Sequence, residues 1–171
     1  MQKITSAYAN KILKSLEEDK KFWINKEAVS NTYVAATNEE PVIPEYDYET
    51  VANTIEKIDK RVVAIKHALN LSNATAKVQV GNEEMSIDSI LIRMAQLNKR
   101  KGVLDELRKK LPKERVYQRS FGASSATPEY KYINYDLELI NQEYERISNA
   151  IMEMQMALDY YNQTVLFEVD I

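Results

Sequence analysis

The chain has 171 residues, enough for one domain with its own hydrophobic core, and a formal net charge of −3 with a pI near 5.4. This charge argues against a general nucleic-acid-binding protein, and the absence of cysteine excludes a disulfide scaffold, a thiolate metal site and a cysteine nucleophile. Charged residues interrupt MQKITSAYANKILKSLEEDKKF, so no signal peptide is expected, and no apolar run is long enough for a membrane span. We expect a cytoplasmic protein with a single helical domain over residues 1–171.

Two helices are predicted in the N-terminal half, separated by a segment with two prolines. The first is expected over about residues 5–23, because apolar residues return there at helical spacing. The segment NEEPVIPEYDYE breaks helix at Pro41 and Pro44, and Asp47 is suited to cap a second helix over about residues 48–69. The buried side of the first helix is expected to hold Ile4, Tyr8, Ile12, Leu16 and Trp23, and that of the second Val51, Ile55, Ile58, Val62, Ile65 and Leu69.

The apolar period changes after the second helix. AKVQV alternates apolar and polar residues and Gly81-Asn82 is a turn signal, so a small β-hairpin is predicted over about residues 76–87. Ser86 or Asp88 then caps a third helix, expected over about residues 88–111 and closed by Pro112. Its seam carries two basic residues towards its C-terminal end and consists of Ile90, Met94, Leu97, Lys101, Leu104, Arg108 and Leu111.

The last helix has the most regular pattern. Its apolar positions alternate in spacing between four and three residues, the a/d pattern of a coiled coil, and predict a helix over about residues 134–167. A helix that spans them is roughly 48 Å long at 1.5 Å per residue, so it must pack against other long helices. The positions are Ile133, Leu137, Ile140, Tyr144, Ile147, Ile151, Met154, Leu158, Tyr161 and Val165.

Together these elements predict an all-α fold, in which long antiparallel helices form a coiled-coil-like bundle with a minor β-hairpin. Tyr144 and Tyr161 are large for a two-stranded core, and each hydroxyl needs a partner if buried, which indicates a core of several helices. The apolar stripes extend beyond what one helical hairpin can cover, so a homo-oligomer is expected.

From about residue 58 onward the order of features resembles the septicolysin-like family of small helical bacterial and phage proteins. The matching stretches are IKHALNLSN, the hairpin, the RMAQL run and the closing MQMALDYYNQT, with Gln155, Asp159 and Asn162. The family commonly has tryptophan after the final asparagine, where this chain has Gln163. The resemblance covers about residues 58–171 and implies a protein with no established enzymatic activity.

Catalysis is weakly indicated. His67 is the only histidine and lies beside apolar seam residues, which favours a structural or surface role over a zinc site. A metal-dependent nucleotide pyrophosphatase would need facing carboxylates at i, i+3 or i+4 on two helices, and an ExxE…ExxD pattern is absent. We therefore assign no catalytic residue, metal ligand or cofactor. Solvated helix surface is favoured for the acids Asp105, Glu106, Glu138, Glu143, Glu145, Glu153 and Asp159.

A basic cluster gives the clearest functional signal. Residues 99–119 carry nine basic and three acidic side chains, a net charge of +6 that leaves −9 on the rest of the chain. The helix dipole favours cations at a helix C-terminus, and this alone explains a lysine-rich helix end. The stretch of about residues 112–133 is expected to be an irregular loop, and long loops in compact domains are usually functional or disordered.

This loop combines arginines with aromatic residues. Arginine can bind a phosphate through two hydrogen bonds and tyrosine rings can stack on a base, although no glycine-rich phosphate fingerprint is present. This composition is expected for a ligand-binding site and equally for the exposed side chains of a surface loop without a ligand. The residues predicted to bind a ligand are Arg115, Tyr117, Arg119, Tyr130, Lys131 and Tyr132.

Three functions remain open. The first is a non-enzymatic oligomer that holds a small anionic, nucleotide-like ligand at subunit junctions, which in a phage would sequester a host immune signal. The second is a helical scaffold or adaptor that acts only through coiled-coil assembly. The third, a nucleotide pyrophosphatase, is disfavoured by the spacing of the acids. The expected partners are further copies of the chain and a small anionic ligand, and neither a membrane nor general nucleic acid.

Overall fold

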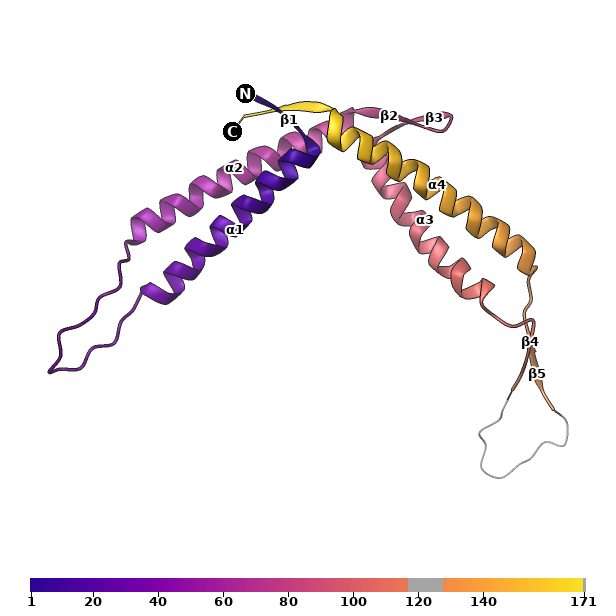
Figure 1. Cartoon of the computed structure of the whole chain (residues 1–171), viewed down its shortest axis with the longest axis horizontal. Helices are drawn as coiled ribbons and strands as arrows, with labels where there is room; N and C mark the ends of the chain where they lie inside the picture. The colour runs from indigo at the N-terminus through magenta and orange to yellow at the C-terminus, as the bar shows by residue number, and fades with distance from the viewer. Residues whose placement is uncertain (117–127, 171) are drawn as a thin grey trace.

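The computed structural model describes residues 1–116 and 128–170. Most of them lie in four long helices that pack in pairs, which confirms the all-α fold. Within each pair the helices are antiparallel, and the two pairs diverge from a common apex like the arms of a V (Figure 1). The first arm consists of α1 (Ser6–Ser30) and α2 (Tyr48–Thr75), and the second of α3 (Ile87–Arg108) and α4 (Leu137–Thr164).

Three two-stranded antiparallel sheets accompany the helices. Two lie at the apex, where β1 (Gln2–Thr5) pairs with β6 (Leu166–Val169) and β2 (Lys77–Val80) with β3 (Glu83–Ser86). The third lies at the far end of the second arm and pairs β4 (Lys113–Arg115) with β5 (Tyr130–Tyr132).

The predicted hairpin near residues 76–87 is confirmed as β2–β3. Val80 pairs with Glu83, so Gly81 and Asn82 form a two-residue turn. Gly81 has φ of +55°, in the left-handed region where a side chain is disfavoured, which explains glycine at this position. Asp47 is confirmed as the N-cap of α2, because its carboxylate accepts a hydrogen bond of 2.8 Å from the amide of Thr50.

Several predicted boundaries were wrong. The first helix does not end near residue 23 but continues to Ser30, since no proline or glycine interrupts that stretch. The second extends beyond residue 69 to Thr75, whereas the third ends at Arg108 instead of residue 111. The last helix ends at Thr164, because residues 166–169 form β6.

The buried face of the first helix was also predicted incorrectly at one position. Tyr8 is half exposed, while Ala9 is fully buried. Ile4 lies in β1, and Thr5 caps the helix by accepting a hydrogen bond from the amide of Tyr8. Helical spacing counted from Ile4 therefore does not apply, because the helix begins only at Ser6.

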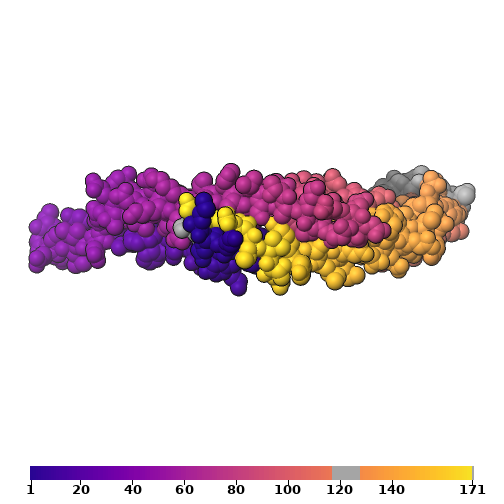
Figure 2. Space-filling model, turned by 90° about the horizontal axis from the view of Figure 1, so that it is seen from above, coloured from indigo at the N-terminus to yellow at the C-terminus, as the bar shows by residue number. Residues whose placement is uncertain are grey.

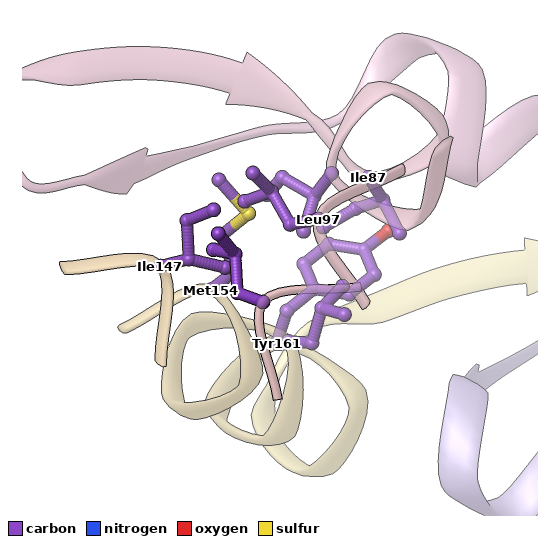
Figure 3. Close-up of a cluster of buried hydrophobic side chains, with 8 residues drawn as sticks. Ile87, Leu97, Ile147, Met154 and Tyr161 are labelled. Atoms are coloured by element: carbon purple, nitrogen blue, oxygen red, sulfur yellow. The ribbon is translucent and has the colours of Figure 1, made fainter. Parts of the chain in front are cut away.

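Each arm has a narrow core of its own. In the second arm the core lies between α3 and α4, and Figure 3 shows Ile87 and Leu97 grouped with Ile147, Met154 and Tyr161. In the first arm it lies between α1, α2 and the strands that contain the chain ends. It consists of the buried residues Ile4, Ala9, Leu16, Ile58, Ile65 and Val169.

The seam predicted for the last helix is the face of α4 that packs on α3. Four of its positions are buried, namely Ile147, Met154, Leu158 and Tyr161. The seam positions closer to the N-terminus of α4 are half-buried, because the helices are covered by no third layer there. Val165 is the C-cap of α4, so the seam ends at Tyr161.

At the apex α2 contacts α3 and α1 contacts α4, and a hydrogen bond and a sheet also join the arms there. The hydroxyls of Tyr161 on α4 and Ser72 on α2 form a hydrogen bond of 2.5 Å. Strand β6 follows α4 and pairs with β1, and this sheet packs against the first arm, where Ile4 and Val169 are buried. Seen from above, the molecule is long and narrow, and β1 and β6 lie side by side near the middle (Figure 2). No helix in residues 1–116 or 128–170 is both long and apolar enough to cross a membrane.

The Tyr161–Ser72 contact can be tested with Tyr161→Phe. Loss of one hydrogen bond between partly buried hydroxyls should lower the free energy of unfolding in urea by about 1 kcal/mol. Tyr160→Phe is the matched control, because Tyr160 is the adjacent residue and is 71% exposed. Equal unfolding free energies for the two variants would show that the contact does not stabilise the apex.

A second variant tests the core of the second arm. Ile147→Ala should destabilise the protein by about 2–5 kcal/mol, because it removes buried methyl groups and leaves a cavity between α3 and α4. Ile147 is 1% exposed, whereas Met156 on the same helix is 67% exposed and Met156→Ala should have little effect. Similar urea midpoints for both variants would mean that this seam is not the packed face.

Candidate functional site

Four of the six predicted ligand-binding residues lie in the β4–β5 hairpin. Arg115 is on β4 and pairs with Tyr130 on β5, which is followed by Lys131 and Tyr132. Tyr117 and Arg119 lie outside the described residues. The prediction of an irregular loop over 112–133 was wrong at both ends, where main-chain hydrogen bonds pair the two short strands.

These side chains project from two opposite faces of the β4–β5 hairpin. Directly opposite residues of antiparallel strands share a face, and successive residues alternate. Lys113, opposite Tyr132, therefore shares one face with Arg115 and Tyr130. The Lys113 ammonium lies 4.1 Å from the ring centroid of Tyr130 and 5.6 Å from that of Tyr132. Glu114 and Lys131, which also pair, occupy the other face.

A pocket of about 510 Å³ lies between the end of α3, the hairpin and the residues before α4. Of the four predicted ligand-binding residues that the structure describes, Lys131 and Tyr132 line it. Tyr135 closes one side, where its hydroxyl donates a hydrogen bond of 2.6 Å to the carbonyl oxygen of Leu107 at the end of α3. The full lining is Lys109, Lys110, Leu111, Glu114, Lys131, Tyr132, Ile133, Asn134 and Tyr135.

Part of the basic cluster has structural partners. Asp105 accepts hydrogen bonds from Arg108, at 2.8 Å, and from Lys109. These bonds lower the pKa of the Asp105 carboxyl, the bond from Lys109 most, and in turn raise the pKa of Lys109. Both groups are solvent-accessible, so the pairs belong to the ordinary stabilisation of a helix C-terminus.

The two basic residues on the third-helix seam also have a partner. Arg108 lies 4.0 Å and Lys101 5.2 Å from the ring centroid of Tyr144 on α4. Cations over a tyrosine face are attracted to its ring electrons, so these residues pack on α4 while their charged groups reach solvent. Tyr144 thus accounts for lysine and arginine at seam positions where apolar residues were expected.

Two lysines of the pocket remain without such partners. Among the described residues, Lys110 and Lys131 form no ion pair, and both are exposed at the rim. They approach the pocket from different elements, the end of α3 and β5, and Tyr132 and Tyr135 provide rings beside them. This combination of separated cations and aromatic rings can hold an anion that carries a flat group.

Sequence reasoning missed several residues of this pocket. Lys110, Asn134 and Tyr135 come together only because the hairpin folds back against the end of α3. One sequence signal was present, since YKY alternates aromatic and charged residues in the manner of a strand. It was hard to interpret because the strands have three residues each and are far apart in the sequence.

The other residues weighed for chemistry are dispersed. His67 is exposed on α2, near the apex. Glu143 pairs with Arg146 at 2.7 Å, and Asp159 accepts a hydrogen bond of 2.9 Å from Gln155. Within residues 1–116 and 128–170, no three histidine, aspartate or glutamate side chains are grouped so that they could hold a metal ion.

No protein-family model matches the chain, and comparisons with curated proteins and with solved structures give no match either. The resemblance to the septicolysin-like family therefore stays a prediction from sequence. The geometry of the pocket and its charges are the observations from which a function can be argued.

The Asp105 ion pairs give a pH-dependent prediction. Because folding lowers the pKa of Asp105, its pairs stabilise the folded state above the unfolded pKa of 3.8 and are lost as pH falls through the folded value. Asp105→Asn should therefore show a smaller loss of stability than the wild type when urea unfolding is compared at about pH 5 and about pH 2.5. Asp19→Asn, an exposed acid on α1, should behave as the wild type; the same pH dependence in both variants would contradict the role of Asp105.

Proposed function

We propose that this protein is a non-enzymatic binding protein that takes up a small anionic, nucleotide-like ligand in the pocket between α3, the β4–β5 hairpin and α4. The observation that carries the proposal is the lining of this pocket. It combines three lysines with one glutamate and places two tyrosines among them. Its volume of about 510 Å³ lies within the range of small-molecule sites.

Each group has a distinct role in this proposal. Lys110 and Lys131 bind the phosphate oxygens, because they approach from two sides and neither forms an ion pair among the described residues. The ring of Tyr132 provides a stacking surface for a base. Glu114 and Asn134 add an acceptor and an amide that can bind the polar edge of that base.

Binding without a reaction is favoured by the positions of the acids. Asp105 is bound to Arg108 and Lys109 and Glu143 to Arg146, so these carboxylates do not face one another across a common site. A hydrolase that uses magnesium needs carboxylates that converge on the phosphate. If the chain is encoded by a phage, we propose that its ligand is a signal nucleotide of the host immune system.

A scaffold is the second candidate function, and an apolar stripe on α4 favours it. Met152, Met156 and Tyr160 are spaced by four residues and are all more than half exposed. They are one helical turn apart and therefore lie on a common face. A face of this kind can contact another helix.

A ligand screen distinguishes these functions. Thermal unfolding would be followed with mononucleotides, cyclic dinucleotides and ADP-ribose derivatives, each with and without magnesium, and the ligand would be recovered for analysis. A stabilising ligand that returns unchanged supports the proposed function. A chemically altered ligand would support the hydrolase, and the absence of any shift would favour the scaffold.

Substitutions then test the pocket itself. Charge-assisted hydrogen bonds contribute about 1.5–3 kcal/mol each, so Lys110→Gln and Lys131→Gln should each weaken binding of the ligand found in the screen at least about tenfold. Their melting temperatures should hardly change, since both lysines are exposed. Lys57→Gln, an exposed lysine on the first arm, is the control in calorimetric titrations. Undiminished affinity in both pocket variants would remove this site from consideration.

A further inference from the structure

The two arms of the V end in opposite charges. The end of the first arm, residues 31–49, carries five carboxylates and no lysine or arginine, and we call it the acidic tip. The carboxylates are Glu39, Glu40, Glu45, Asp47 and Glu49. The end of the second arm, residues 108–116 and 128–135, carries six basic and two acidic residues, a net charge of +4, and we call it the basic tip.

The acidic tip exposes apolar side chains that its own arm does not cover. Val34 is fully exposed, Val42 is 89% exposed, and Ile43 is also exposed. Residues 31–47 contain neither helix nor strand, and two hydrogen bonds connect this stretch to α1, from the Asn31 amide to the carbonyl oxygen of Glu27 and from the Tyr46 hydroxyl to the Glu27 carboxylate. Charged and apolar groups displayed together on an extended segment suit a protein partner better than solvent alone.

The basic tip offers a matching surface. The face of the hairpin with Lys113 and Arg115 also exposes the rings of Tyr130 and Tyr132. Glu114 lies on the opposite face, towards the pocket, so within β4 and β5 this face has two cations and no acid. It can therefore receive carboxylates together with aliphatic side chains.

We infer that the acidic tip of one copy docks on this face of the basic tip of a second copy. The tips of one chain cannot meet, because they lie at opposite ends of the V (Figure 1). Both copies have the same distance between their tips. A second copy related to the first by a two-fold axis through the midpoint between the tips has its acidic tip at the basic tip of the first copy, and its basic tip at the acidic tip. Two copies therefore form both junctions at once and close a ring.

This inference goes beyond the proposed function and does not rest on it. The docking face and the pocket share Tyr132, but the acidic tip lies at the other end of the molecule and contributes no residue to the pocket lining. Ligand affinity can therefore be measured in a variant of the acidic tip whose pocket is intact.

The mass of the protein in solution tests the inference. Light scattering should give a dimer at low salt that dissociates near 1 M salt, because the screening length falls from about 10 Å at 0.1 M to about 3 Å. A monomer at low salt would overturn the inference. A dimer of unchanged stability at high salt would also overturn it and would point to the apolar stripe of α4.

Charge reversal provides the sharper experiment. Glu39→Lys with Glu40→Lys, and separately Lys113→Glu with Arg115→Glu, should each weaken the dimer at least about tenfold at low salt. The control is Glu17→Lys with Glu18→Lys, which reverses an equivalent exposed pair of acids on α1 and should leave the dimer intact. Circular dichroism would verify that all variants keep their helices.

Mixing the two reversed proteins gives the decisive result. In a mixed pair, the reversed charges at positions 39 and 40 of one protein face the reversed charges at positions 113 and 115 of the other, and the second junction joins two unchanged surfaces. An equimolar mixture should therefore form a heterodimer more tightly than either protein dimerises alone. Failure of the folded variants to associate in the mixture would overturn the inference. Nucleotide titrations of the Glu39→Lys, Glu40→Lys protein would show separately whether the pocket binds a ligand.

Discussion

Each arm of the V is only two helices thick, and this constraint determines which side chains are buried and which remain exposed. A helix with one neighbour can bury one stripe, so the buried residues of α4 follow its seam and the next face is left exposed at Met152, Met156 and Tyr160. The same constraint divides the core into two clusters, because no element extends along both arms. Contacts between the arms are confined to the apex, where Tyr161 meets Ser72 and β1 pairs with β6.

Charged residues also lie in the interface between the two helices of the second arm. Lys101 and Arg108 occupy seam positions on α3, and the ring of Tyr144 receives both cations. Asp105 holds Arg108 and Lys109 from the solvent side. Lys110 at the end of α3 and Lys131 on the hairpin, in contrast, form no ion pair within residues 1–116 and 128–170. Lys109 and Lys110 are thus adjacent in the sequence, yet of the two only Lys109 has an ion-pair partner within the described residues.

Regular local patterns made much of the fold predictable. The seam of α4, the cap at Asp47 and the turn at Gly81 each depend on residues within a few positions of one another. The β1–β6 sheet was missed because its two strands of four residues lie at opposite ends of the chain. In the pocket, Lys131 and Tyr132 were predicted from composition, whereas Lys110 and Tyr135 depend on how the hairpin packs against α3. The role of Lys101 was unpredictable for the same reason, since its partner Tyr144 belongs to another helix.

The pairing of β1 with β6 has a consequence for the order of folding. The helices of each arm are joined by one connection and can associate soon after they form, whereas residue Gln2 must find Val169 across nearly the whole chain. The entropy lost on closing a loop grows with its length, so contacts between distant segments are slow to form unless earlier structure brings them together. The helical hairpins shorten this search, because their packing places the first and last strands at the same apex. We therefore expect the chain ends to join last and to separate first, as a local opening that leaves both arms folded.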